Sequence, residues 1–247
     1  MNTSNNWKSL YKIGAVAALI LLLYSLVTMV ILITIGGQPE TAQEGFTMLQ
    51  NNRLAGLLRL DVLMILIMPL YYPLFLGLYT TLKKVQIANT TLAVVLVFAG
   101  LTLALATPSA FSWLALSDKF AAATSAEQKT LLLAAGEAIL ASDMWHGSGA
   151  IVGGILLQTG ALLMSVVMRQ SPNFSKATAY VGMVTHGLDL LHILVSFFAL
   201  QTSFILMAVA GPLYLVWFPL LARDLFRLSR SSSDEASRRT NVSIAIS

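Results

Sequence analysis

The sequence predicts an all-α fold, a polytopic integral membrane protein built as a bundle of six transmembrane helices. The first observation is composition: of 247 residues, 57% are hydrophobic and 11% are charged, whereas a soluble domain carries about 25% charged residues. The second is a mean hydropathy of +0.77. The third is six apolar runs, each long enough to cross a hydrocarbon core of about 30 Å, which takes roughly 20 helical residues. These runs are residues 10–35, 55–82, 90–113, 146–168, 177–200 and 203–226.

The basic residues indicate the orientation, because cytoplasmic loops of membrane proteins are enriched in Lys and Arg. With the N-terminus inside, 11 of the 15 basic residues fall at the inner ends of the runs. They are Lys8, Lys12, Lys83, Lys84, Arg169, Lys176, Arg223, Arg227, Arg230, Arg238 and Arg239. We therefore expect both termini in the cytoplasm and the chain in a bacterial cytoplasmic membrane. The expected partner is the lipid bilayer and not nucleic acid; protein partners stay open.

The segments between the runs predict further elements. The outer segment 36–54 carries apolar residues on one helical face, and segment 113–145 contains Ser125-Ala-Glu-Gln128, which is typical of a capping box. Both predict a short amphipathic helix. The transmembrane domain is predicted over residues 1–228. Residues 229–247 are rich in Ser and charge, which predicts a disordered cytoplasmic tail.

Glycine and proline predict how the helices pack and bend. Gly149 and Gly153 have the spacing that lets two membrane helices approach closely, so we expect them to serve packing. Each proline inside a run removes a backbone donor and is expected to kink its helix. These prolines are Pro69, Pro73, Pro108, Pro212 and Pro219.

Three ionisable residues stand within one predicted span: His186, Asp189 and His192. Ionisable groups inside a bilayer are costly and often functional. At 100° per residue, Asp189 lies about 60° from each histidine, and the histidines lie about 120° apart. The three side chains are therefore expected to form a fan with the carboxylate in the middle.

Other spans are expected to bring polar groups to a similar depth. Asp61 is predicted one to two turns inside the outer end of the second span, and Asp143 and His146 enter the fourth span from outside. Together with the fan, these residues predict a polar site in the outer half of the bundle. Arg53 and Arg59 lie nearer the surface as supporting residues.

Several kinds of chemistry fit such a site, and the residues leave them open. Three histidines with carboxylates suit zinc, with His146, His192 and Asp189 as ligands, and a bound water would make a metal-dependent intramembrane hydrolase. Haem with His146 and His192 as axial ligands is another metal option. A small-molecule, ion or proton pathway needs only ionisable groups beside a wet cavity. A non-catalytic partner or sensor subunit, with the polar groups joining helices, is the remaining hypothesis. The chain has no cysteine, which excludes thiolate sites and disulfides.

Short segments resemble a family of uncharacterised bacterial six-helix membrane proteins, a domain of unknown function. They are Tyr11-Lys-Ile-Gly14, Asn52-Arg53-Leu-Ala-Gly56-Leu-Leu-Arg-Leu-Asp61, Leu78-Tyr79-Thr-Thr-Leu82 and Phe174-Ser175-Lys-Ala-Thr-Ala-Tyr180-Val-Gly182. The resemblance covers residues 8–228. It implies an integral membrane fold, carries no activity or cofactor, and draws attention to Arg53 and Asp61.

Overall fold

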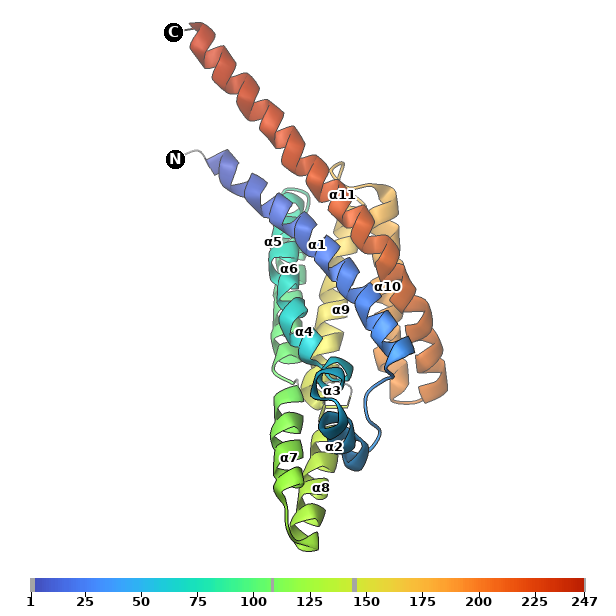
Figure 1. Ribbon diagram of the computed structural model, residues 1–247. Helices are drawn as coiled ribbons and strands as arrows, with labels where there is room; N and C mark the ends of the chain where they lie inside the picture. The colour runs from blue at the N-terminus through green and yellow to red at the C-terminus, as the bar shows by residue number, and fades with distance from the viewer. Residues whose placement is uncertain (1–2, 108, 144–145, 247) are drawn as a thin grey trace. The chain divides into compact units, whose positions relative to one another are not determined.

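The described part of the chain is helical and contains no strand, as a computed structural model shows (Figure 1). The structure describes the backbone of residues 3–107, 109–143 and 146–246, and the side chains of residues 8–107, 109–143 and 146–230. The elements are α1 (Thr3–Thr34), α2 (Ala42–Asn51), α3 (Arg53–Arg59), α4 (Val62–Ile67), the 3₁₀ turn η1 (Met68–Leu70), α5 (Tyr71–Leu82), α6 (Ile87–Leu105), α7 (Ala110–Ala122), α8 (Ala126–Leu140), α9 (Ser148–Met168), α10 (Lys176–Ser196) and α11 (Leu200–Ile246).

Six of the described segments are long and apolar enough to cross a membrane, which confirms the predicted all-α membrane fold. They are Lys8–Thr34, Val62–Leu82, Ile87–Ala122, Ser148–Met168, Lys176–Ser196 and Leu200–Arg230. Large apolar side chains point outward on these segments, for example Leu32 and Ile33 on α1 and Leu191 on α10. An apolar exterior of this kind matches lipid and not water. The protein is therefore a multi-pass membrane protein.

Two predicted span boundaries are wrong. The second span begins at Val62 and not at residue 55, because Leu60 is extended and separates α3 from α4. Asp61 consequently stands before the first residue of α4 instead of one to two turns inside a long helix. The candidate third span ends at Ala122 and not at residue 113, and it contains both α6 and α7. Pro108, a predicted kink, lies outside the described residues.

Most of the local predictions are confirmed. Helices α2 and α8 occupy segments 36–54 and 113–145, where the sequence predicts short helices, and Ser125 caps α8 by accepting a hydrogen bond from the Gln128 backbone N–H at 3.1 Å. Pro69 lies in η1, where a 3₁₀ turn interrupts the second span. Pro212 and Pro219 lie within the single helix α11, and the kinks predicted at them stay predictions. The predicted disorder of residues 229–247 lies almost wholly outside the residues whose side chains are described, so it stays a prediction.

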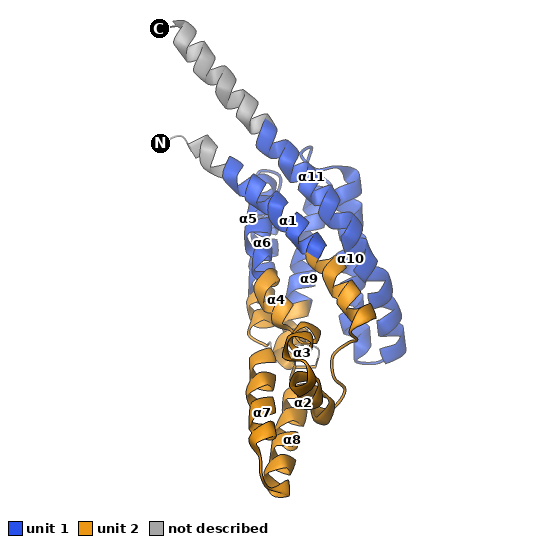
Figure 2. Cartoon of the chain, in the orientation of Figure 1, with its two compact units in different colours: residues 1–23, 69–99, 155–247 blue, residues 24–68, 100–154 orange. Residues whose placement is uncertain are grey.

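The chain forms two compact units, which Figure 2 colours separately. Unit 1 comprises residues 1–23, 69–99 and 155–247, and unit 2 comprises residues 24–68 and 100–154. The prediction of one transmembrane domain over residues 1–228 concerns how these units join, and it stays a prediction.

Glycine sets the closest helix contacts within each unit. In unit 1, a Cβ on Gly160 of α9 would lie 2.6 Å from the backbone oxygen of Ala93 on α6. In unit 2, a Cβ on Gly153 would lie 2.8 Å from the backbone oxygen of Gly100. The packing role predicted for Gly149 and Gly153 is confirmed, since only a residue without Cβ permits such an approach.

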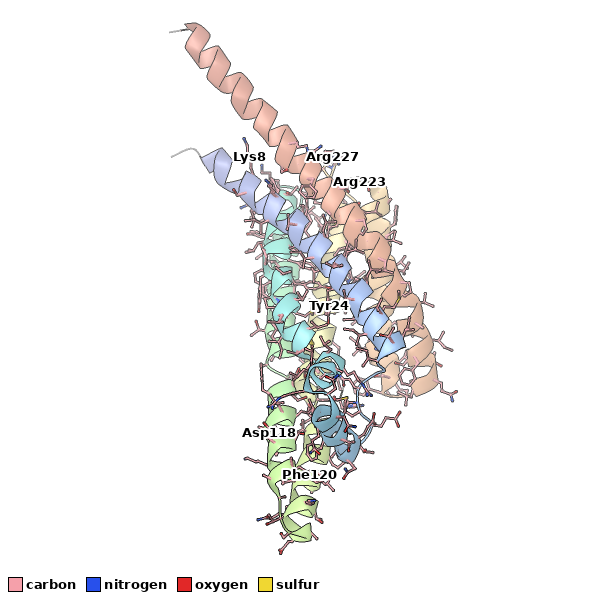
Figure 3. All side chains as sticks on the ribbon, in the orientation of Figure 1. Lys8, Tyr24, Asp118, Phe120, Arg223 and Arg227 are labelled. Carbon is pink, nitrogen blue, oxygen red and sulfur yellow. The ribbon has the colours of Figure 1, made fainter. Side chains whose placement is uncertain are left out.

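Unit 2 has an aromatic core of its own. Phe46 of α2 and Trp113 of α7 are buried and meet edge to face, with ring centroids 5.6 Å apart. The cluster also includes buried Ala42, Leu49, Leu60 and Ala110. Figure 3 labels Asp118 and Phe120 on α7, and Phe120 also packs against Phe46.

Candidate functional site

The centre of unit 1 holds a hydrogen-bonded cluster of four polar side chains, which we call the central polar cluster: Gln158, His186, Asp189 and Tyr214. They come from α9, α10 and α11, and α10 packs against α11 (Figure 1). His186 is only 1% exposed and Gln158 is 8% exposed, whereas Asp189 and Tyr214 are half-buried. The cluster therefore joins a fully enclosed imidazole to a partly accessible carboxylate.

The Gln158 amide links Asp189 to His186. Its Nε2 donates to Asp189 Oδ2 at 2.6 Å, and its Oε1 lies 2.8 Å from His186 Nδ1. An ionised carboxylate only accepts, so the amide nitrogen must face Asp189 and the amide oxygen must face the imidazole. His186 consequently carries a proton on Nδ1, an assignment that follows from the network.

The Tyr214 hydroxyl reaches every other member of the cluster. It donates to Asp189 Oδ2 at 2.8 Å and lies 3.1 Å from Gln158 Nε2. Its distances to Gln158 Oε1 and His186 Nδ1 are 3.3 Å and 3.4 Å. Tyr214 lies between Pro212 and Pro219 in α11. A phenol both donates and accepts, so Tyr214 can bridge the carboxylate and the imidazole.

Aromatic packing encloses the far side of His186. The Trp217 ring is perpendicular to the imidazole, with centroids 4.6 Å apart. Gly182 makes room for the indole, because a Cβ there would lie 2.5 Å from Trp217 Nε1. His186 Nε2 and Trp217 Nε1 are both buried without a hydrogen-bond partner among the described residues. One nitrogen of His186 is thus engaged in the cluster, and the other faces a dry environment.

Sequence analysis missed Gln158 and Tyr214, although a signal for both was present. Gln158 is the central residue of the 21-residue span of α9, and His186 is the central residue of the 21-residue α10. Tyr214 lies one residue from the middle of the Leu200–Arg230 span. Polar residues at the middle of three consecutive antiparallel spans share one depth, and their hydrogen-bonding groups need partners there.

His186, Asp189 and His192 all lie on α10, and the described hydrogen bonds join them to different partners. The described hydrogen bonds of Asp189 go to Gln158 and Tyr214 and not directly to either histidine. His192 instead accepts from or donates to Ser203 at the start of α11, with Nδ1 2.7 Å from Ser203 Oγ. His192 therefore joins the α10–α11 turn, while His186 belongs to the cluster.

The remaining predicted carboxylates and His146 make their contacts within unit 2. Asp61 is 3% exposed and accepts from the backbone N–H groups of Ser109 and Ala110 at 2.5 Å and 2.9 Å. It thereby caps the N-terminus of α7, where the helix dipole favours an anion. Asp143 Oδ1 lies 2.9 Å from His146 Nδ1 and accepts from the His146 backbone N–H at 3.0 Å.

The two supporting arginines also lie in unit 2. Arg59 donates to the backbone oxygen of Gly37 at 2.6 Å and pairs with Glu44 at 3.0 Å. Arg53 pairs with Asp118 at 2.8 Å, and both side chains are more than half exposed. Arg53 and Asp118 border an open groove of about 420 Å³. Its lining residues are Leu49, Gln50, Arg53, Leu114, Ser117, Asp118 and Ala121.

The hypothesis of one convergent site in the outer half of the bundle stays a prediction. Asp61, Asp143 and His146 belong to unit 2, whereas Asp189 and His192 belong to unit 1. Among the described residues, no three His, Cys, Asp or Glu side chains form a group that could hold a metal ion. The proposed zinc ligands His146, His192 and Asp189 and the haem pair His146 and His192 therefore gain no structural support.

A further buried carboxylate, Asp224, was also missed. It is fully buried, and its Oδ2 accepts from the Ser175 backbone N–H at 2.9 Å and from the Thr178 hydroxyl at 2.6 Å. Its Oδ1 accepts from Arg223 at 3.1 Å. Asp224 ties α11 to the first turn of α10 and has a structural role.

No protein-family model, no curated protein and no solved structure matches this chain. The family resemblance noted above stays a prediction, and any functional argument must come from the site itself.

Proposed function

We propose that this protein binds and passes protons across the membrane at Asp189, and that the central polar cluster of unit 1 is its proton-binding site. The observation that carries this proposal is the chain of contacts from a half-buried carboxylate, through Gln158 and Tyr214, to the buried imidazole of His186. Each end of that chain carries a group that can hold a proton. A proton moves along hydrogen bonds, so its site needs no large cavity.

The composition of the cluster favours protons over metal ions or larger ligands. Among the residues whose side chains are described, Asp189 is stabilised by two neutral donors and by no Lys or Arg, so its carboxylate stays free to take up a proton. Inside a bilayer, an ionisable residue without a permanent counter-ion is costly and typical of proton relays.

The proposed orientation places both termini in the cytoplasm of a bacterial cell, in the cytoplasmic membrane. Charge segregation between the units supports it. Within residues 8–230, unit 1 contains nine basic residues, Lys8, Lys12, Lys83, Lys84, Arg169, Lys176, Arg223, Arg227 and Arg230, against two acidic ones, Asp189 and Asp224. Unit 2 contains four basic residues, Arg53, Arg59, Lys119 and Lys129, against seven acidic ones. Lys8, Arg223 and Arg227 are labelled in Figure 3.

Cysteine labelling tests this orientation, and the cysteine-free chain makes single-cysteine variants simple. In intact cells, Lys83→Cys, in the turn between α5 and α6, should not react with a membrane-impermeant maleimide until the membrane is permeabilised. Lys129→Cys on α8 is the matched control and should react from outside. Labelling of Lys83→Cys in intact cells would overturn the orientation.

Proton flux tests the function. The full chain is reconstituted into vesicles that contain a pH-sensitive dye, and a potassium diffusion potential drives protons inward. We expect flux above that of protein-free vesicles, and a fall of about tenfold or more in Asp189→Asn, because an amide cannot take up the proton. Asp189→Glu should recover part of the flux, since it keeps the carboxylate.

The matched control is Asp118→Asn, which removes an exposed carboxylate of unit 2 and should leave the flux unchanged. Two results would refute the proposal: wild-type flux equal to that of empty vesicles, or Asp189→Asn with wild-type flux. A lower unfolding temperature of Asp189→Asn with unchanged flux would assign Asp189 a structural role.

A further inference from the structure

The Tyr214 hydroxyl is the one group of the central polar cluster that lies near both ionisable ends. It is 2.8 Å from Asp189 Oδ2 and 3.4 Å from His186 Nδ1. We propose that protons pass between Asp189 and His186 through the Tyr214 hydroxyl, and that Gln158 is a positioning residue. This inference rests on the proposed proton function and names the route within the same site.

The chemistry of the two bridging groups separates their roles. A hydroxyl accepts a proton on its oxygen while it releases its own, and it ends the transfer as the same group. The Gln158 amide donates from nitrogen and accepts on oxygen, so passing a proton through it requires an imidic acid or a rotation of the amide. Both of its ends are already engaged at 2.6 Å and 2.8 Å. The amide therefore holds Asp189 and His186 in place and does not carry the proton.

The transfer balances without any co-reactant. It begins with His186 protonated on both ring nitrogens and with Asp189 ionised. The Tyr214 O–H bond breaks as its proton forms a bond to Asp189 Oδ2, and the His186 Nδ1 proton forms a new O–H bond on Tyr214. The phenol is regenerated, Asp189 becomes a neutral carboxylic acid, and His186 becomes neutral with its proton on Nε2. Asp189, the half-buried end of the route, exchanges its proton with water, and His186 holds the proton at the enclosed end.

The step requires a small movement of Tyr214 toward His186. The imidazole N–H now donates to Gln158 Oε1 at 2.8 Å, and the longer 3.4 Å distance to Tyr214 must shorten to a hydrogen-bond distance near 2.8 Å. Tyr214 lies in a segment of α11 between Pro212 and Pro219, each of which removes one backbone donor from the helix. A helix segment with fewer hydrogen bonds yields more easily.

Titratable groups from the neighbouring elements complete the surroundings of this route. His192 lies one turn beyond Asp189 on α10 and is bonded to Ser203. Tyr71 of α5 packs edge to face against Phe218, whose ring also contacts the Tyr214 ring. Trp217 covers the far side of His186. None of these side chains carries a fixed charge.

The test compares Tyr214→Phe with Tyr180→Phe in the vesicle assay described above. Tyr214→Phe removes only the bridging oxygen, and we expect the initial proton flux to fall by about tenfold or more. Tyr180→Phe removes a hydroxyl from an exposed position of α10, and we expect wild-type flux. Gln158→Met should lower the flux less than Tyr214→Phe does, because it disturbs the position of both partners but leaves the hydroxyl in place.

Infrared spectroscopy gives a signal that would not change if Tyr214 had only a structural role. The carbonyl stretch of protonated Asp189, identified by its absence in Asp189→Asn, should shift in Tyr214→Phe because the carboxylic acid loses its phenol partner. Wild-type flux in Tyr214→Phe, or a larger loss in Gln158→Met, would overturn this route. If Asp189→Asn already has wild-type flux, the proposed function fails and not merely the route.

Discussion

Replacing Gly160 with leucine is expected to prevent α9 from packing on α6 and to unfold unit 1 at a much lower temperature. A Cβ at this position would lie 2.6 Å from the Ala93 backbone oxygen and 2.8 Å from the Val97 backbone nitrogen. Backbone atoms of a neighbouring helix cannot move aside as a flexible side chain can. Overpacking typically costs about 1–3 kcal/mol, and a clash with backbone belongs at or above the upper end of that range.

The matched control is Gly211→Leu in α11, because no atom lies within 4 Å of a Cβ built there. Thermal unfolding in detergent, followed by tryptophan fluorescence, compares the two variants with the wild type.

Gly160→Ala tests separately whether the steric clash causes the loss of stability. Alanine gains about 1 kcal/mol of helix propensity over glycine, so a lower unfolding temperature in that variant would reflect the clash alone. Equal unfolding temperatures for Gly160→Leu and Gly211→Leu would contradict the close contact of α6 and α9.

Replacing Trp113 with alanine is expected to remove the centre of the unit 2 core. Trp113 is 1% exposed, meets Phe46 edge to face and covers Gly45, where a Cβ would lie 2.5 Å from the indole ring. A large aromatic residue replaced by alanine in a core costs about 3–5 kcal/mol, because the cavity adds to the lost burial. We expect α2 to detach from α7 and to become sensitive to protease.

Phe111→Ala is the control for Trp113→Ala, since Phe111 belongs to the same helix and is 66% exposed. Limited proteolysis of the detergent-solubilised protein, with cleavage sites mapped by mass spectrometry, measures the exposure of residues 42–51. Cleavage there in Trp113→Ala and not in Phe111→Ala is the expected result. Equal cleavage in both variants would mean that the Phe46–Trp113 contact does not hold unit 2 together.

Features that depend on neighbouring residues in the chain were predictable from the sequence. The spans follow from the length and hydropathy of the apolar runs, and six of them are present. The α8 cap follows from Ser125 and Gln128, which are three residues apart. The helix contact at Gly153 follows from the small residues on one face of α9. Each of these signals lies within a single helix or at its end.

The break before Val62 could not be predicted from hydropathy, because residues 55–82 form a single run in which only Arg59 and Asp61 are charged. The break coincides with the use of the Asp61 carboxylate as a cap for α7, 48 residues away in the sequence. A long-range hydrogen bond of this kind has no local signature. The ionisable residues of α10 stand out in the sequence. Their hydrogen-bond partners do not, because those partners lie on other helices.

The sequence by itself determined that this chain is a helical membrane protein and that α10 carries ionisable groups at mid-span. Composition and periodicity are properties of the chain, and the bilayer requires every backbone polar group of a span to be satisfied within its helix. Only the tertiary structure decided which groups those residues contact. It joined Asp189 to His186 through Gln158 and Tyr214, assigned His192 to Ser203, and assigned Asp61 to the cap of α7. The physical reason is that a buried polar side chain must find its hydrogen-bond partner on whichever helix packs beside it.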